Sequence, residues 1–181
     1  MKKNVLVFGL ISGSIISLFM ALSMANCFGS NHFGTSSMVI GFTAMIVAFA
    51  FVFVGIKNQR DKLNGGLISF GQAFMTGLWI TLIASTMYVI TWMFEFHYFM
   101  PDFMDKYSAI MIEQTKSSGL PPDQLQVELD KITMMQENYK SPFYRIMYTY
   151  IEIFPVGLII TLISALILKR KEKDPVEISV A

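Results

Sequence analysis

Two long stretches of this sequence contain no charged side chain. No Lys, Arg, Asp or Glu occurs from Asn4 to Ile56, and none occurs from Leu63 to Phe94. About 20 apolar residues suffice to cross the roughly 30 Å hydrocarbon core of a bilayer. A soluble domain would need charged surface positions within runs of this length. Since the chain is also 54% hydrophobic and only 15% charged, far from ordinary soluble composition, the sequence predicts a membrane protein.

The uncharged runs, with a third apolar stretch near the C-terminus, predict four spanning helices. The first run is too long for one crossing, and its Gly, Ser and Asn residues at 29–37 favour a turn within it. The predicted spans are residues 4–27, 37–56, 70–94 and 143–168. We therefore expect an all-α, four-span helical bundle that forms a single membrane domain, residues 1–171. A short cytoplasmic tail, residues 172–181, follows it.

The first span also has features of a secretory signal, because Lys2 and Lys3 precede an apolar stretch. A lipoprotein signal requires a small residue directly before the cysteine, and Asn26 stands before Cys27. We expect a retained helix, with lipidation of Cys27 as the alternative. Because Cys27 is the single cysteine, the chain can form neither an intramolecular disulfide nor a multi-cysteine metal cluster.

Lys and Arg residues are distributed unequally between the two sides of the predicted membrane. Cytoplasmic segments are enriched in these residues, so both termini are predicted to be cytoplasmic. The net charge of only +1 predicts no nucleic-acid partner. The predicted cytoplasmic side has Lys2, Lys3, Lys57, Arg60, Lys62, Lys169, Arg170, Lys171 and Lys173, whereas the other side has Lys106, Lys116, Lys131, Lys140 and Arg145 with eight acids.

Residues 95–141 form the largest polar segment and predict an extracytoplasmic helical hairpin between spans three and four. Pro101 is expected early in its first helix, Gly119 ends that helix, and Pro121–Pro122 begins the second. The second helix has an apolar stripe that includes Leu125, Leu129 and Ile132. Either the hairpin or the membrane surface buries this stripe, or the stripe is a docking face for another chain. Exposure of Leu129 and Ile132 would favour docking.

Several stretches, in this order along the chain, are similar to a known family: "GGLISFGQAFMTGLWITLIASTMYVI", "MPDFMDKY", "GLPPDQLQ" and "PVGLIITLISALILKRK". Together they resemble a family of bacterial four-helix membrane proteins catalogued as domain of unknown function 4199. The resemblance covers roughly Asn4 to Lys171. It implies the same four-span topology in a bacterial inner membrane. It implies no activity and no catalytic residues, since none is assigned to the family.

Glu152 lies inside the fourth predicted span, where an ionised side chain is costly. Its place six residues after Ile146 puts it about 9 Å along the helix, which is compatible with hydration near the outer headgroups. Pro155 follows closely and leaves the carbonyl of Ile151 without its usual helical partner. Three interpretations of Glu152 stay open: an interfacial or structural residue, a carboxylate that handles protons or cations, and a catalytic group.

His32, Glu95, His97 and Glu152 are all predicted toward the outer side of the membrane. Two imidazoles with two carboxylates are a ligand set that suits zinc. The four residues come from three separate segments, however, and their spacing does not require a shared site. We expect scattered interfacial residues and no cofactor, with a zinc site as the alternative.

Small residues recur at four-residue spacing in two spans. Gly9 and Gly13 form one such pair, and Ala73 and Gly77 form another. Small residues at this spacing let helix backbones approach closely in lipid, so these pairs serve either packing within the chain or self-association. At the start of the third span, Ser69 and Gln72 have the spacing of a capping box, which predicts a helix from Phe70.

No catalytic arrangement stands out in the sequence, so we expect a protein that is not an enzyme. The amphipathic hairpin favours a non-enzymatic scaffold or partner-binding membrane subunit. Its expected contacts are the lipid bilayer and either a membrane or periplasmic protein or a second copy of itself. The alternative function is a small transporter or channel component that uses Glu152.

Overall fold

The structure, a computed structural model, describes residues 2–27 and 35–170. Every regular element in these residues is helical. The turn at 29–37 lies largely outside the described residues, as do His32, the tail and the side chain of Cys27. The elements are α1 (Lys2–Cys27), α2 (Thr35–Asn58), the π-helical turn η1 (Gln59–Leu63), α3 (Phe70–Tyr98), α4 (Phe103–Ser117), α5 (Pro122–Tyr139) and α6 (Pro142–Leu168).

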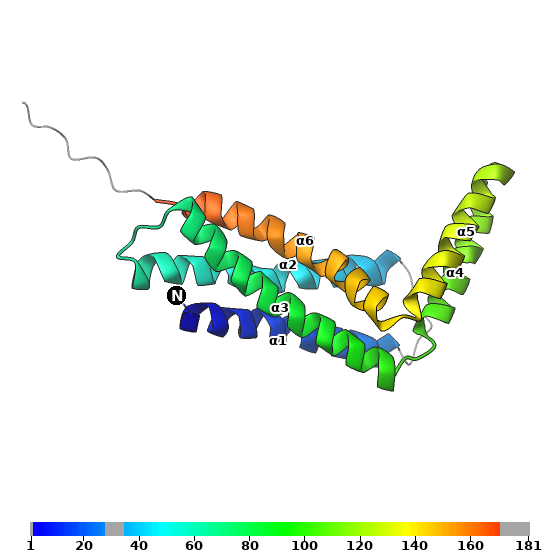
Figure 1. Cartoon of the computed structure of the whole chain (residues 1–181), viewed down its shortest axis with the longest axis horizontal. Coiled ribbons are helices and arrows are strands. Elements are labelled where there is room, and N and C mark those ends of the chain that lie inside the picture. Colours follow the sequence, from blue (N-terminus) through cyan, green and yellow to red (C-terminus); the bar gives the residue numbers. More distant parts are fainter. Residues whose placement is uncertain (1, 28–34, 171–181) are drawn as a thin grey trace, which may run out of the picture.

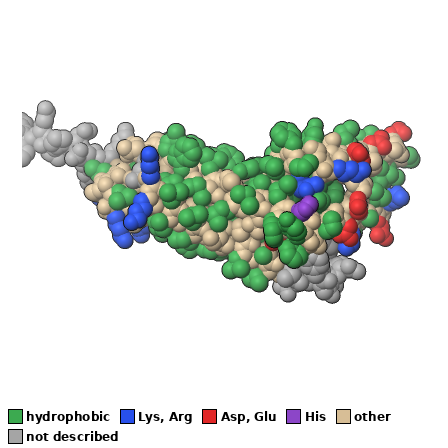
Figure 2. Space-filling model, turned by 60° about the horizontal axis from the view of Figure 1, so that its bottom comes forward, with side chains coloured by type: hydrophobic (Ala, Val, Ile, Leu, Met, Phe, Trp, Pro, Cys, Tyr) green, Lys and Arg blue, Asp and Glu red, His purple; other side chains and the backbone are tan. Residues whose placement is uncertain are grey.

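Four of the helices are long and apolar enough to cross a membrane, in agreement with the four spans expected from the sequence. The candidate spans are Lys2–Ser23, Val39–Leu63, Phe70–Tyr98 and Pro142–Leu168. Helices α1, α2, α3 and α6 lie side by side, and α4 and α5 lie beyond one end of them (Figure 1). On the face drawn in Figure 2, basic side chains gather at the end away from the hairpin, and acidic side chains gather over the hairpin.

Two helix boundaries differ from the sequence prediction. Helix α3 continues past Phe94 to Tyr98, so Glu95 and His97 belong to the spanning helix and not to the hairpin. Glu95 is only 7% exposed. Its side chain is therefore buried within the protein, and α3 continues past it. Helix α6 begins at Pro142, one residue before the predicted start at 143, because the first turn of a helix does not need the missing N–H of proline.

Close packing at small residues joins α3 to its neighbours. A Cβ atom at Gly9 would stand 2.9 Å from the Ile83 side chain, and one at Gly77 would stand 2.7 Å from Thr161. Gly9, Gly13 and Ala73 are buried in the single chain. In lipid, where apolar burial alone gives little drive for helix association, such close approach supplies the packing energy. The two small-residue pairs therefore serve packing within the chain and leave no free glycine surface for self-association.

Buried polar side chains add hydrogen bonds between the spans. Ser12 Oγ donates to the Ala48 carbonyl at 2.8 Å, which joins α1 to α2. The hydroxyls of Thr81 and Thr161 lie 3.0 Å apart and join α3 to α6. Near the start of α1, Asn4 Nδ2 donates to the Gly55 carbonyl at 2.9 Å. Each of these groups would otherwise be an unsatisfied polar group in an apolar medium.

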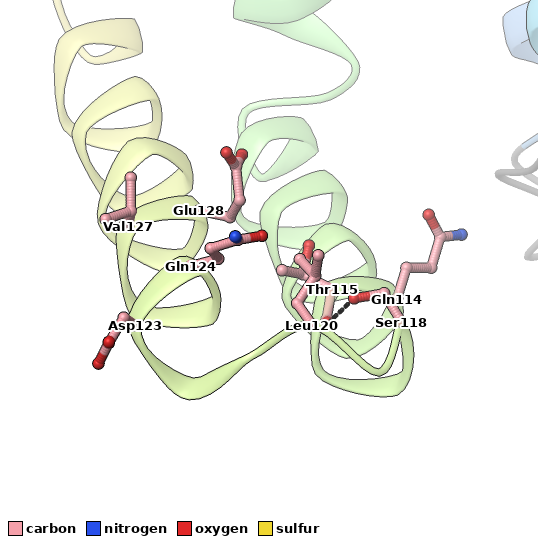
Figure 3. Close-up of a pocket in the computed structure, with 8 residues that line it drawn as sticks. All are labelled: Gln114, Thr115, Ser118, Leu120, Asp123, Gln124, Val127 and Glu128. Atoms are coloured by element: carbon pink, nitrogen blue, oxygen red, sulfur yellow. Dashed lines mark hydrogen bonds between the residues drawn. The ribbon is translucent and has the colours of Figure 1, made fainter.

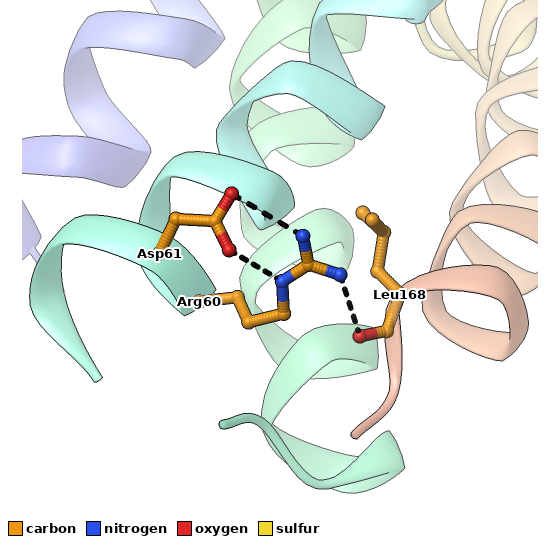
Figure 4. Close-up of polar contacts among 3 residues, drawn as sticks. All are labelled: Arg60, Asp61 and Leu168. Atoms are coloured by element: carbon orange, nitrogen blue, oxygen red, sulfur yellow. Dashed lines mark hydrogen bonds and ion pairs between the residues drawn. The ribbon is translucent and has the colours of Figure 1, made fainter. Parts of the chain in front are cut away.

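The end of the spans away from the hairpin is held together by backbone and side-chain contacts. Ile68 and Arg170 exchange backbone hydrogen bonds of 3.0 and 2.9 Å. Arg60 pairs with Asp61 at 2.6 Å and donates through Nη1 to the Leu168 carbonyl at 3.5 Å (Figure 4). These contacts connect the segment between α2 and α3 to the last turn of α6.

The start of α3 has a capping box. Ser69 Oγ accepts from the Gln72 backbone N–H at 3.3 Å, and Gln72 Oε1 accepts from the Ser69 N–H at 3.4 Å. Gly65 and Gly66, at φ +62° and +88°, form the preceding turn. Both conformations favour glycine, which has no Cβ.

Helices α4 and α5 pack against each other beyond the spans. Gly119, at φ +71°, lies in the turn between them, and Gln136 Nε2 donates to Asp105 Oδ1 at 2.8 Å. Ile132 is 5% exposed, and Leu125 and Leu129 are half-buried. The condition that would favour docking through Leu125, Leu129 and Ile132 is therefore not met. That interpretation is corrected, because the stripe faces the interior of the hairpin.

Substitution of Gly157 by alanine tests the close packing of α3 against α6. The new Cβ would stand 2.5 Å from Thr81 Cγ2 and 2.8 Å from the Phe49 ring, and we expect a loss of about 1–3 kcal/mol of stability. Gly41→Ala is the control, since nothing lies within 4 Å of its Cβ position. Thermal unfolding in detergent, followed by tryptophan fluorescence, measures both. Equal midpoints for the two variants would contradict this packing.

Candidate functional site

Arg145 caps the C-terminal end of α5 from the first turns of α6. Its Nη2 donates to the carbonyl of Tyr139 at 3.2 Å and to that of Lys140 at 3.5 Å. The residue is 8% exposed. A cation at this position satisfies carbonyls that have no partner within the helix and interacts favourably with the negative end of the helix dipole.

The guanidinium lies over the rings of Phe96 in α3 and Tyr139 in α5, and two more aromatic residues pack beside these rings. Its carbon atom lies 3.6 Å from the centre of the Phe96 ring, a cation–π contact. Trp92 Nε1 donates to Tyr139 Oη at 2.7 Å, and Trp92 meets the Phe103 ring edge-on at 4.9 Å. We call this group the Arg145 junction; its members are Trp92, Phe96, Phe103, Tyr139 and Arg145.

The Arg145 junction connects the hairpin to the spans. Trp92 and Phe96 belong to α3, Phe103 to α4, Tyr139 to α5 and Arg145 to α6. Burial raises the pKa of Tyr139 to about 12, although the hydrogen bond from Trp92 and the charge of Arg145 oppose that rise. The phenol therefore stays neutral at physiological pH and keeps accepting from Trp92. The position of α4 and α5 relative to the spans is fixed by these contacts.

Glu152 lies in the central part of α6, three residues from the midpoint of that helix toward its start at Pro142. Gly157 faces Thr81 and Gly77 faces Thr161 across the antiparallel pair α6 and α3. This register puts Glu152 level with Thr86, two residues, or about 3 Å, from the midpoint of α3. The hydroxyl of Thr86 lies 2.8 Å from that of Tyr150, in agreement with this register.

The Glu152 side chain is exposed on the outer face of α6. It forms no hydrogen bond or ion pair with the residues that the structure describes, although Tyr88 and Tyr139 lie within electrostatic range. An ionised acid at the centre of a spanning helix costs at least about 2.5 kcal/mol. The three interpretations of Glu152, as an interfacial or structural residue, as a carboxylate that handles protons or cations, and as a catalytic group, therefore stay predictions.

The other predicted site residues are kept apart. Glu95 is buried, and its Oε2 has no hydrogen-bond partner within the described part of the chain. His97 is exposed and meets the Tyr98 ring edge-on at 4.7 Å. His32 lies outside the described residues. Within residues 2–27 and 35–170, no three His, Cys, Asp or Glu side chains converge into a metal site.

An open depression lies at the tip of the hairpin. It is formed by the last turn of α4, the Gly119 turn and the first turns of α5 (Figure 3). The residues that line it are Gln114, Thr115, Ser118, Leu120, Asp123, Gln124, Val127 and Glu128. Its mixed polar and apolar lining suits a protein surface better than a small molecule, which prefers an enclosed apolar cavity.

The sequence interpretation missed the role of Arg145. It counted Arg145 among the cations of the outer loop, although the residue lies within the predicted fourth span, 143–168. An arginine inside an apolar helix, close to several aromatic residues, is the signal that would have identified it. No pattern in the sequence indicates that Trp92 and Tyr139 pack against each other, because they lie 47 residues apart in the chain.

Comparison with known proteins gives one match. A family model described as "Protein of unknown function (DUF4199)" matches residues 7–170. Neither the curated proteins nor the solved structures provide a match. The family match therefore agrees with the resemblance noted in the sequence and adds no activity.

Replacement of Arg145 by glutamine tests the junction. We expect a loss of about 2 kcal/mol of stability, because two carbonyls lose a charged donor and Phe96 loses its cation. Lys140→Gln is the control, since its ion pair with Glu137 is exposed and contributes little. Thermal unfolding with Trp92 fluorescence as the readout, in a Trp79→Phe background, measures both. If Arg145→Gln unfolds at the same temperature as Lys140→Gln, the junction does not hold the hairpin.

Proposed function

The chain belongs to the DUF4199 family, and from this premise we propose that it is a non-enzymatic membrane subunit that binds a protein partner through its hairpin. In this proposal the spans anchor the protein in a bacterial inner membrane. The termini are cytoplasmic, and α4 and α5 lie outside the cytoplasm. The unequal distribution of Lys and Arg supports this orientation.

The observation that carries the proposal is an exposed apolar pair on the outer face of α5. Val127 is 52% exposed and Met134 is 66% exposed. Their spacing of seven residues puts them on one face, two helical turns or about 10 Å apart. This face differs from the buried stripe of Leu125, Leu129 and Ile132. Large apolar side chains clustered on a surface are typical of protein contact sites.

The Arg145 junction supports the same proposal because it holds this face in a fixed orientation. A preorganised surface loses less conformational entropy when a partner binds. The charge of the hairpin adds a constraint on that partner. Residues 99–141 contain seven acids and four Lys residues, so the partner that fits best has an apolar centre and a basic rim.

A second candidate function is a small transporter or channel component. The position of Glu152 in the central part of α6, with Tyr88 in electrostatic range, favours it. Four helices are few for a conduction path, so this function would require several copies. Proton or cation flux into liposomes that stays unchanged in Glu152→Gln would count against it.

Site-specific photo-crosslinking from the outer face of α5 tests the proposed function. A photoreactive residue at position 127 or 134 is expected to give the same partner adduct in native membranes, because both positions belong to one face. Val127→Asp combined with Met134→Asp should weaken capture by about tenfold or more, as expected for central interface residues.

The matched control has the photoreactive residue at position 62, which is exposed at the opposite end of the molecule. The same adduct from position 62, or no adduct from positions 127 and 134, would refute binding through the hairpin.

A further inference from the structure

We propose that the outer face of α6 around Glu152 binds a transmembrane helix of another protein that carries a Lys or Arg side chain at mid-membrane depth. This site is separate from the outer face of α5, because Glu152 lies among the spans and Val127 lies on the hairpin. The inference therefore concerns a second contact, made within the bilayer.

The first argument is the position of Glu152. Glu152 lies level with Thr86, two residues from the midpoint of α3, and is exposed on α6 beside the buried Ile153. Gly13, near the midpoint of α1, lies beside Ala84, the midpoint of α3. The midpoints of α1 and α3 therefore lie at the same level along the bundle, within about 3 Å of the level of Glu152. Intramembrane acids usually face a protein interior or a water-filled cavity. An exposed acid at this depth indicates that protein covers this face in the assembled state.

The second argument is a backbone acceptor beside the carboxyl group. Pro155 has no N–H, so the carbonyl of Ile151 lacks its usual hydrogen bond within α6. Ile151 is 62% exposed, and Pro155 is exposed on the same face. Glu152 and the Ile151 carbonyl therefore offer acceptors next to each other. The Lys and Arg side chains have three and five N–H donors and no acceptor, so they match this arrangement.

The third argument is that none of the cations in the described spans forms an ion pair with Glu152. Arg145 lies seven residues, or about 10 Å, from Glu152 along α6 and donates to the carbonyls of Tyr139 and Lys140. Lys57 and Arg60 lie at the opposite end of the spans. The complementary charge must therefore come from outside the described residues of this chain.

Charge also decides between a basic helix and a second copy. Two copies that met through this face would bring two Glu152 carboxyl groups together, and like charges at short range disfavour the ionised forms. A basic side chain would pair with the carboxylate and with the free carbonyl at once. The surrounding side chains, Tyr148, Ile151 and Ile159, are exposed and apolar or amphipathic, which suits the flank of another membrane helix.

A defined transmembrane peptide tests this proposal. The probe is a leucine–alanine helix with one central Lys, and the matched probe has Met in place of Lys. Energy transfer between labelled peptide and full-length protein in liposomes measures binding. We expect the Lys peptide to bind about tenfold more tightly than the Met peptide, and we expect Glu152→Gln to abolish that preference.

Ile159→Ala is the control variant, since it lies two turns away on the same face and should keep the preference for Lys. Equal binding of both peptides to the unaltered protein would overturn the proposal, and so would a preference that survives Glu152→Gln. A Tyr148→Cys variant in a Cys27→Ser background tests contact between two copies through this face. If disulfide bonds form efficiently between copies and the Lys peptide does not reduce their yield, the face binds a second copy and the proposal is overturned. None of these results depends on the hairpin contact tested by photo-crosslinking.

Discussion

Close contact between α3 and its neighbouring helices holds the spanning region together. Lipid gives apolar side chains nearly the same environment as another helix does, so tight packing and hydrogen bonds must supply the association energy. Gly9 and Gly13 of α1 admit side chains of α3, while Gly157 of α6 faces Thr81. The hydroxyl pair Thr81 and Thr161 lies within this contact. The register between the helices, and hence the depth of Glu152, follows from these small residues.

The Arg145 junction extends this order beyond the spans. A buried guanidinium is costly unless its donors find acceptors, and Arg145 Nη2 finds them in the carbonyls of Tyr139 and Lys140 at the end of α5, whereas its Nε has no hydrogen-bond partner among the described residues. The same group lies over the Phe96 ring of α3. Together with the Trp92–Tyr139 hydrogen bond and the Trp92–Phe103 ring contact, it holds α4 and α5 against the spans. A fixed hairpin with an exposed apolar pair on α5 is the basis of the proposed scaffold function.

Glu95 and Glu152 have different environments, although the sequence predicted both toward the same side of the membrane as scattered residues. Glu95 is 7% exposed near the end of α3, whereas Glu152 is exposed on α6 at mid-depth. Helix rotation causes this difference, because a rotation of about 100° per residue decides whether a side chain faces a neighbouring helix or lipid. Glu152 is therefore accessible to a partner within the bilayer, whereas Glu95 is not.

The helical class, the four candidate spans and the start of α3 could all be predicted from the sequence. Each of these depends on local composition or on contacts between residues close in the chain, as in the Ser69–Gln72 capping box. The tertiary structure alone decided the inward direction of Ile132, the role of Arg145 and the depth of Glu152. These features depend on which residues meet across helices that are distant in the chain, such as Trp92 and Tyr139. Spacing along one helix does not contain that information, because it does not specify the rotation and register of the neighbouring helix.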